Sequence, residues 1–132
     1  MHRVLKIGQW VVDFMFCPER YDISAVVAVL RELSATSAII EQAIDLMESG
    51  DENTGFTYTH DGRKRGLVVI GPSSSGSEFL DTFSHEIYHV ASAVAESLGK
   101  RLDGEGPAYI AGDTARDLLD VVCQLGCKHC HK

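Results

Sequence analysis

The chain has 132 residues, of which 45% are hydrophobic, and this is enough to enclose one core, so we expect residues 1–132 to form a single domain. A formal net charge of -7 argues against nucleic acid or an anionic membrane surface as a partner, because both repel an acidic protein. No apolar run approaches the roughly 20 residues that cross a bilayer. The apolar stretch at residues 10–17 is interrupted by Asp13 and lacks the small-residue cleavage site of a secretory signal, so we expect a cytoplasmic protein.

The first half of the chain is expected to contain one strand and two helices. Residues 4–17 are rich in Val, Phe and Trp and end at Pro18, which predicts a strand. Asp22 or Ser24 can cap a first helix, and a second helix is expected over Ser37–Ser49, stopped by the glycine that follows it.

The second half carries a predicted hairpin and two predicted helices. Gly55–His60 and residues 66–70 are β-prone runs that flank a polar linker opening with Asp-Gly. Ser75 and the glutamate three residues later have the spacing of a capping box, so a long helix begins there and is expected to end before Gly99. A last helix over about residues 104–125 follows. The sum is an α+β fold of about four helices packed on a small antiparallel sheet, with a returning helix after the long one.

The long helix carries the residues with the clearest chemistry. His85 and His89 are four positions apart, so their imidazoles lie one turn from each other on one face and can share a metal ion. Glu86 follows the first histidine and is placed to take a proton from water that the metal activates. The pattern therefore predicts a zinc site with Glu86 as the base.

Helical periodicity separates the two histidines from the apolar face of this helix. At about 100° per residue, His85 and His89 fall nearly opposite the apolar arc, which argues against two core histidines and leaves surface histidines as the plain alternative. The arc predicted to be buried consists of Phe79, Leu80, Phe83, Ile87, Val90, Val94 and Leu98.

A catalytic zinc usually has a third protein ligand, and four downstream acids are candidates: Glu96, Asp103, Glu105 and Asp113. Glu96 is about 10 Å along the axis from His89 and cannot converge with it. We prefer Glu105, because the chain reverses after Gly99 and the next helix starts with this residue. The plain alternative is an acid that stabilises a helix N-terminus.

The run from Ser84 to His89, together with the Glu-Gly-Pro-Ala-Tyr-Ile-Ala-Gly run that starts at Glu105, resembles the small gluzincin-type zinc metallopeptidases of bacteria and prophages. The resemblance covers about residues 55–112. It implies His85, His89 and Glu105 as zinc ligands and Glu86 as general base and acid, in a minimal gluzincin-like fold. The position where larger gluzincins carry an acid that orients a histidine is Tyr109 here.

Several roles stay open at this level. Tyr109 or Asp113 can orient a histidine ligand, and Tyr109, Tyr58 and His60 are candidates for the donor to the oxyanion of a peptide substrate, each also explained as a packing or turn residue. A strand of the hairpin, if it is an exposed edge, can bind an extended peptide by β-augmentation.

The C-terminal tail carries most of the cysteines, which in a cytoplasmic chain are expected to be thiols or metal ligands. The run from Cys127 to His131 matches the haem c attachment signature, but we expect no covalent haem without a secretory signal. Cys123, Cys127 and Cys130 with a histidine can form a second metal site, and a polar C-terminal tail is the default interpretation.

Three functions compete on this evidence. The first is a zinc peptidase acting on a peptide or protein. The second is a non-catalytic zinc-binding interaction module with a gluzincin-like core, and the third is an adaptor whose histidines bind nothing. The oligomeric state is not predicted.

Overall fold

The computed structural model describes residues 1–18 and 22–126. Within them an α+β fold is formed by four strands and five helices, so the predicted class is correct and the predicted number of helices is one too low. The elements are β1 (His2–Ile7), β2 (Trp10–Phe16), α1 (Asp22–Glu32), α2 (Ser37–Ser49), β3 (Gly55–His60), β4 (Arg65–Ile70), α3 (Gly76–Ser97), α4 (Glu105–Asp117) and α5 (Leu119–Gly126).

The sheet has the order β1-β2-β4-β3 and is mixed, which corrects the predicted antiparallel sheet. The predicted hairpin is confirmed, because β3 and β4 pair antiparallel. Strands β2 and β4 pair parallel, since the chain leaves β2, passes through α1 and α2, and returns by way of the hairpin. A central strand is buried on both faces, and the almost continuous apolar run of β2 fits this position.

The single strand predicted over residues 4–17 is wrong. The chain forms a second hairpin here, with β1 and β2 antiparallel about Gly8 and Gln9. Gly8 has a φ of 61°, in the left-handed region that glycine enters at little cost, and this allows the tight reversal.

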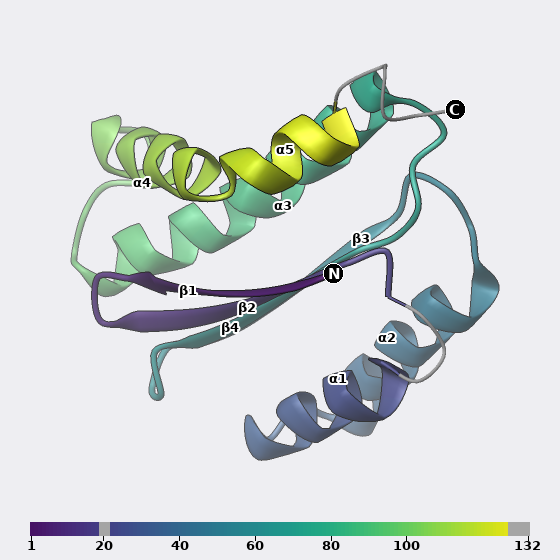
Figure 1. Cartoon of the computed structure of the whole chain (residues 1–132). Helices are drawn as coiled ribbons and strands as arrows, with labels where there is room; N and C mark the ends of the chain where they lie inside the picture. Colours follow the sequence, from purple (N-terminus) through teal and green to yellow (C-terminus); the bar gives the residue numbers. More distant parts are fainter. Residues whose placement is uncertain (19–21, 127–132) are drawn as a thin grey trace.

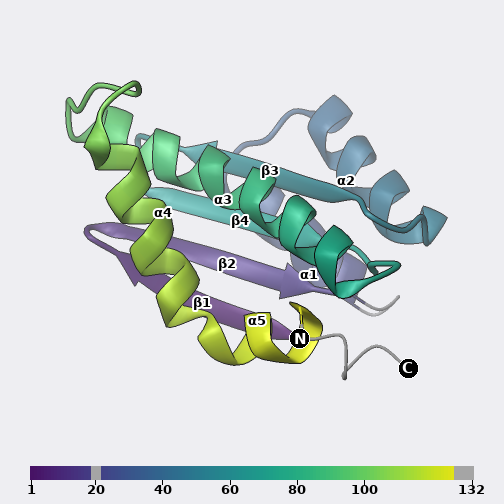
Figure 2. The ribbon, with the colours of Figure 1, turned by 90° about the horizontal axis from the view of Figure 1, so that it is seen from above.

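Helices cover both faces of the sheet (Figure 1). Helices α1 and α2 lie on one face, and α3, α4 and α5 lie on the other. Seen from above, α3 follows the β4–β3 half of the sheet, and α4 and α5 lie towards β1 (Figure 2). Alternate residues of β2 and β4 point to opposite faces, so the sheet separates two apolar cores.

The last predicted helix is divided in two. Leu118 interrupts it, with a ψ of 20° and a fully buried side chain, and its backbone N–H is shared between Thr114 and Ala115. The local sequence contains neither glycine nor proline at this point, so no breaker residue marks the break. None of the described helices is both long enough and apolar enough to cross a bilayer.

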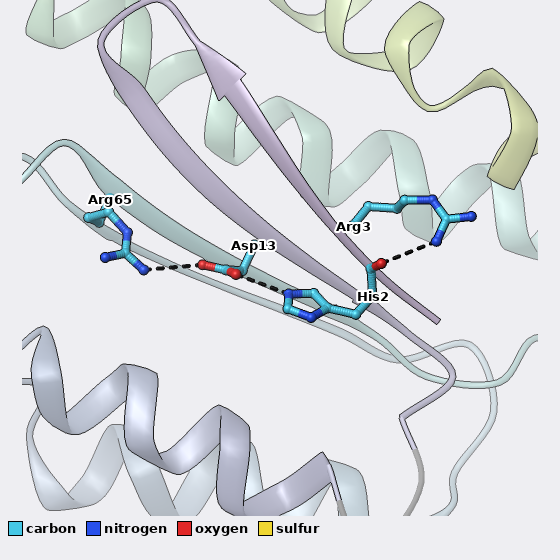
Figure 3. A network of polar contacts seen from close by, with 4 residues as sticks. All are labelled: His2, Arg3, Asp13 and Arg65. Atoms are coloured by element: carbon cyan, nitrogen blue, oxygen red, sulfur yellow. Dashed lines mark hydrogen bonds and ion pairs between the residues drawn. The ribbon is translucent and has the colours of Figure 1, made fainter.

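A polar network fixes the sheet on the face of α1 and α2 (Figure 3). The buried Asp13 on β2 accepts from Arg65 of β4 at 3.3 Å and contacts His2 of β1 at 3.0 Å. Arg65 also lies 3.7 Å from Glu32 at the end of α1. A carboxylate removed from water is stabilised only when such partners surround it, so this network links three strands and one helix.

Candidate metal centre

Helix α3 carries the candidate centre and is fixed at its start and along one face. Ser75 is the N-cap, and its hydroxyl accepts from the backbone N–H of Glu78 at 3.1 Å, as the capping box predicts. Gly99, with a φ of 72°, follows the last turn as expected. Most of the predicted apolar arc is buried, but Leu80 and Leu98 are 42% and 61% exposed, so the arc is narrower than predicted.

The two histidines lie on the outer face of α3, as the periodicity predicts. Both are exposed, and the Nε2 atom of His85 lies 3.2 Å from the Nε2 atom of His89. Two nitrogens that each bind a tetrahedral zinc at about 2.0–2.1 Å are separated by about 3.3 Å. The two rings are within hydrogen-bond distance of each other, and the same spacing fits two neighbouring zinc ligands.

Glu86 lies next to the two histidines, between α3 and β3. It is only 4% exposed, and its Oε2 atom accepts a hydrogen bond from the hydroxyl of Thr57 at 3.3 Å. Gly55 makes room for it, because a Cβ atom at that position would lie 2.8 Å from Cγ of Glu86. The strand thus fixes the position of the carboxylate relative to the helix.

His85, Glu86 and His89 form a group whose possible ligand atoms all lie within 4.8 Å of one another. Glu86 is a buried carboxylate that, within the described residues, accepts a hydrogen bond from the neutral hydroxyl of Thr57, an arrangement that is costly unless a positive charge is close. Two imidazole nitrogens and one carboxylate are the donor types that zinc prefers. The residues present therefore fit a zinc ion.

Two hollows meet at this group. One, of about 360 Å³, is lined by Glu86 and His89 of α3, by the length of β3 and by Ile39 and Gln42 of α2. The other, of about 260 Å³, is lined by His85 and Glu86 together with Asn53 and Asp81. Glu86 belongs to both hollows, so a ligand in either one can reach its carboxylate.

The structure does not bring Glu105 into this group. It is the exposed first residue of α4, and α4 starts beyond the end of α3, whose last residue is roughly 12 Å along the helix axis from His89. Within the described ranges, the metal-binding group contains no acid from α4. The assignment of Glu105 as third ligand stays a prediction.

The other predicted site residues are spread over the molecule. Tyr109 is 69% exposed on α4, and Asp113 pairs with Arg116 at 3.3 Å. Tyr58 packs against the core on the α1 and α2 side, and its hydroxyl donates to the carbonyl of Leu33. The ring of His60 accepts from the backbone N–H of Arg63 in the hairpin turn. The hydrogen bonds of Tyr58 and His60 therefore serve packing and the turn.

The predicted second site in the tail lies mostly outside the described residues. Cys123 is exposed near the end of α5, whereas Cys127, Cys130 and the tail histidines are beyond the described range. The interpretations of the tail stay predictions.

The contact of β3 with Glu86 was not predicted from the sequence. Gly55, Thr57 and Thr59 alternate along the strand, so they share the face that meets α3, and Thr57 is the partner of Glu86. The alternation of small and hydroxyl residues with Phe56 and Tyr58 was a signal that could have indicated this face.

Comparison of the chain with protein-family models, with curated proteins and with solved structures finds no match.

Proposed function

We propose that the protein is a zinc-dependent peptidase whose centre is His85, Glu86 and His89. The single observation that carries the proposal is the geometry of this group: two exposed imidazoles with zinc-like spacing next to a buried carboxylate. The resemblance of the two helical runs to small gluzincin-type metallopeptidases supports it.

His85 and His89 would hold the ion through their Nε2 atoms. Zinc supplies Lewis acidity, which polarises a carbonyl and lowers the pKa of water towards about 7. The Oε1 atom of Glu86 then takes the proton from the attacking water and passes it to the leaving amine, while Thr57 holds Oε2. The hydrogen bond from Thr57 keeps the carboxylate in one orientation.

The position of β3 supports a peptide substrate. Only β4 pairs with β3 among the described strands, so the backbone groups on the other edge of β3 are available for pairing. This edge lies at the hollow that also contains Glu86 and His89. An extended peptide that pairs with this edge would run alongside β3, and its main chain would pass the candidate centre.

The test compares the wild-type chain with Glu86→Gln, which keeps the size of the side chain and removes its basicity. We expect Glu86→Gln to retain zinc and to lose hydrolysis of a mixed peptide library, measured by mass spectrometry. Unchanged hydrolysis would show that Glu86 is not the base. Loss of zinc would show that Glu86 is a ligand instead.

One observation favours a second function, a non-catalytic zinc-binding interaction module. The group in the described structure already contains three donors if Glu86 is counted, and Glu105 is not one of them. If Glu86 is the third ligand, no base remains in the group. Glu86→Gln distinguishes the two functions, because it keeps zinc and loses hydrolysis if Glu86 is the base, and weakens zinc binding if Glu86 is the third ligand.

A further inference from the structure

The hollows that border β3 extend beyond the candidate centre, and together they are called the groove. A third hollow, of about 300 Å³, is lined by Thr59 and Asp61 on the strand side and by Ala93, Glu96 and Ser97 of α3, with Trp10. It shares Thr59 with the hollow at Glu86, which in turn shares Gly55 with the hollow at His85. The three hollows therefore follow the whole length of the edge strand.

The elements that form the groove carry charge of one sign. Helix α2 has three acids, α3 has four and β3 has none, which gives seven carboxylates. The chain has 12 lysine and arginine residues, but these three elements contain none of them. The acids are Glu41, Asp45 and Glu48 on α2 and Glu78, Asp81, Glu86 and Glu96 on α3. Of these seven, Asp81, Glu86 and Glu96 line the hollows, and no lysine or arginine of the described residues lines them.

Two of these carboxylates stand at opposite ends of the groove. Asp81 lines the hollow beside His85, and Glu96 lines the third hollow. In the latter, Asp61 pairs with Lys64 at 3.2 Å, so part of its charge is compensated. Glu96 is exposed, and the ion pairs of the described part of the chain do not include it. Lys64 also lies beside this hollow, with its Nζ atom 5.9 Å from the centre of the Trp10 ring, so the hollow has two carboxylates and one ammonium group next to it. A cation that enters it would meet the carboxylate of Glu96.

From these features we propose that the groove selects an extended polypeptide segment with lysine or arginine side chains, and that Glu96 is the main determinant of this preference. The proposal rests on the proposed function and specifies its substrate class. An edge strand binds the main chain of any peptide, so it gives affinity without sequence specificity. Charge complementarity supplies the specificity, because an acidic groove attracts cationic segments and repels acidic ones.

The first experiment measures binding to the full-length, zinc-loaded Glu86→Gln protein, so that the peptides stay intact. Three fluorescent peptides of one length carry two arginines, two alanines or two glutamates, and their dissociation constants are measured by polarisation at about 50 mM and about 300 mM NaCl. We expect the arginine peptide to bind about tenfold more tightly than the alanine peptide, the glutamate peptide to bind most weakly, and the preference to shrink at the higher salt concentration.

The matched control separates Glu96 from the overall charge of -7. Glu96→Gln and Asp117→Asn each remove one exposed carboxylate, but Asp117 is on α4 and does not line the groove. We expect Glu96→Gln to reduce the preference for arginine about threefold or more and Asp117→Asn to leave it unchanged. Equal effects of the two variants, or equal binding of the three peptides, would overturn the proposal.

A hydrolysis assay with the wild-type protein separates this proposal from the peptidase. Cleavage of all three peptides at one rate would reject the basic preference and keep the peptidase. A preference for arginine in binding without any cleavage would support the groove and reject the peptidase.

Discussion

Replacing Gly55 by alanine tests whether β3 fixes the position of the candidate base. The new Cβ atom would lie 2.8 Å from Cγ and 2.9 Å from Cδ of Glu86, and 3.1 Å from Cγ2 of Thr82. Carbon atoms in contact prefer about 3.5–4.0 Å, so strand and carboxylate must separate by roughly 1 Å.

The size of the effect follows from this displacement. Overpacking of this kind costs about 1–3 kcal/mol, which for a chain of this length lowers the melting temperature by about 4–12 °C. A misplacement of about 1 Å at a reacting group can lower the rate about 100-fold. We therefore expect Gly55→Ala to fold and to lose about two orders of magnitude in kcat/KM. It should also keep its zinc, because neither histidine is among the atoms nearest to the new Cβ atom.

The assay combines peptide hydrolysis, metal analysis and thermal unfolding. Gly112→Ala is the matched control, since Gly112 is within α4 and a Cβ atom there meets nothing within 4 Å. It should raise stability by about 0.5–1 kcal/mol, because alanine favours a helix, and leave hydrolysis unchanged. If Gly55→Ala keeps both its melting temperature and its kcat/KM, the strand does not govern the placement of Glu86.

Three further outcomes test the centre, the start of α3 and one surface ion pair. Zinc at a concentration of about 100 times its dissociation constant should stabilise the wild-type chain by about 2.7 kcal/mol in thermal unfolding. His85→Ala should abolish this stabilisation. His60→Ala is the control and should keep it, because His60 is outside the metal-binding group. Ser75→Ala should cost about 1 kcal/mol in denaturant unfolding, because the cap of α3 is lost, and no loss would contradict the capping box. Arg3 hydrogen-bonds Asp120 and lowers the pKa of that carboxyl, so the pair stabilises the fold above the ordinary carboxyl range and ceases to do so as the pH falls through the lowered pKa. The difference in melting temperature between wild type and Asp120→Asn should therefore disappear in acid. A difference that grows in acid would show that the ionised Asp120 does not stabilise the fold through Arg3.

Local sequence was sufficient where short-range physics decides the structure. The N-cap at Ser75, the left-handed glycine at position 99 and the hairpin of β3 and β4 all depend on residues a few positions apart, and all three predictions are confirmed. The same holds for the exposure of His85 and His89, because helical periodicity alone places them away from the apolar face.

Predictions failed where long-range packing competes with local preference. The parallel pairing of β2 with β4 joins segments more than 50 residues apart and depends on how α1 and α2 cover one face of the sheet. No glycine or proline next to Leu118 predicts the end of α4, where this side chain is fully buried in the core. Leu80 and Leu98 are exposed because the neighbouring elements do not cover the whole predicted arc.

Helical periodicity read from the residues alone places two imidazoles, His85 and His89, on one face of a helix with the carboxylate of Glu86 beside them, which is the basis of the predicted zinc site. The surroundings of these side chains depend on the tertiary fold. The mixed sheet leaves β3 as an edge beside α3, which buries Glu86 against Gly55 and Thr57 and leaves a hollow between β3, Glu86 and His89. The physical reason is that periodicity orients side chains around one helix, whereas the partner of each face depends on strand pairing between distant parts of the chain.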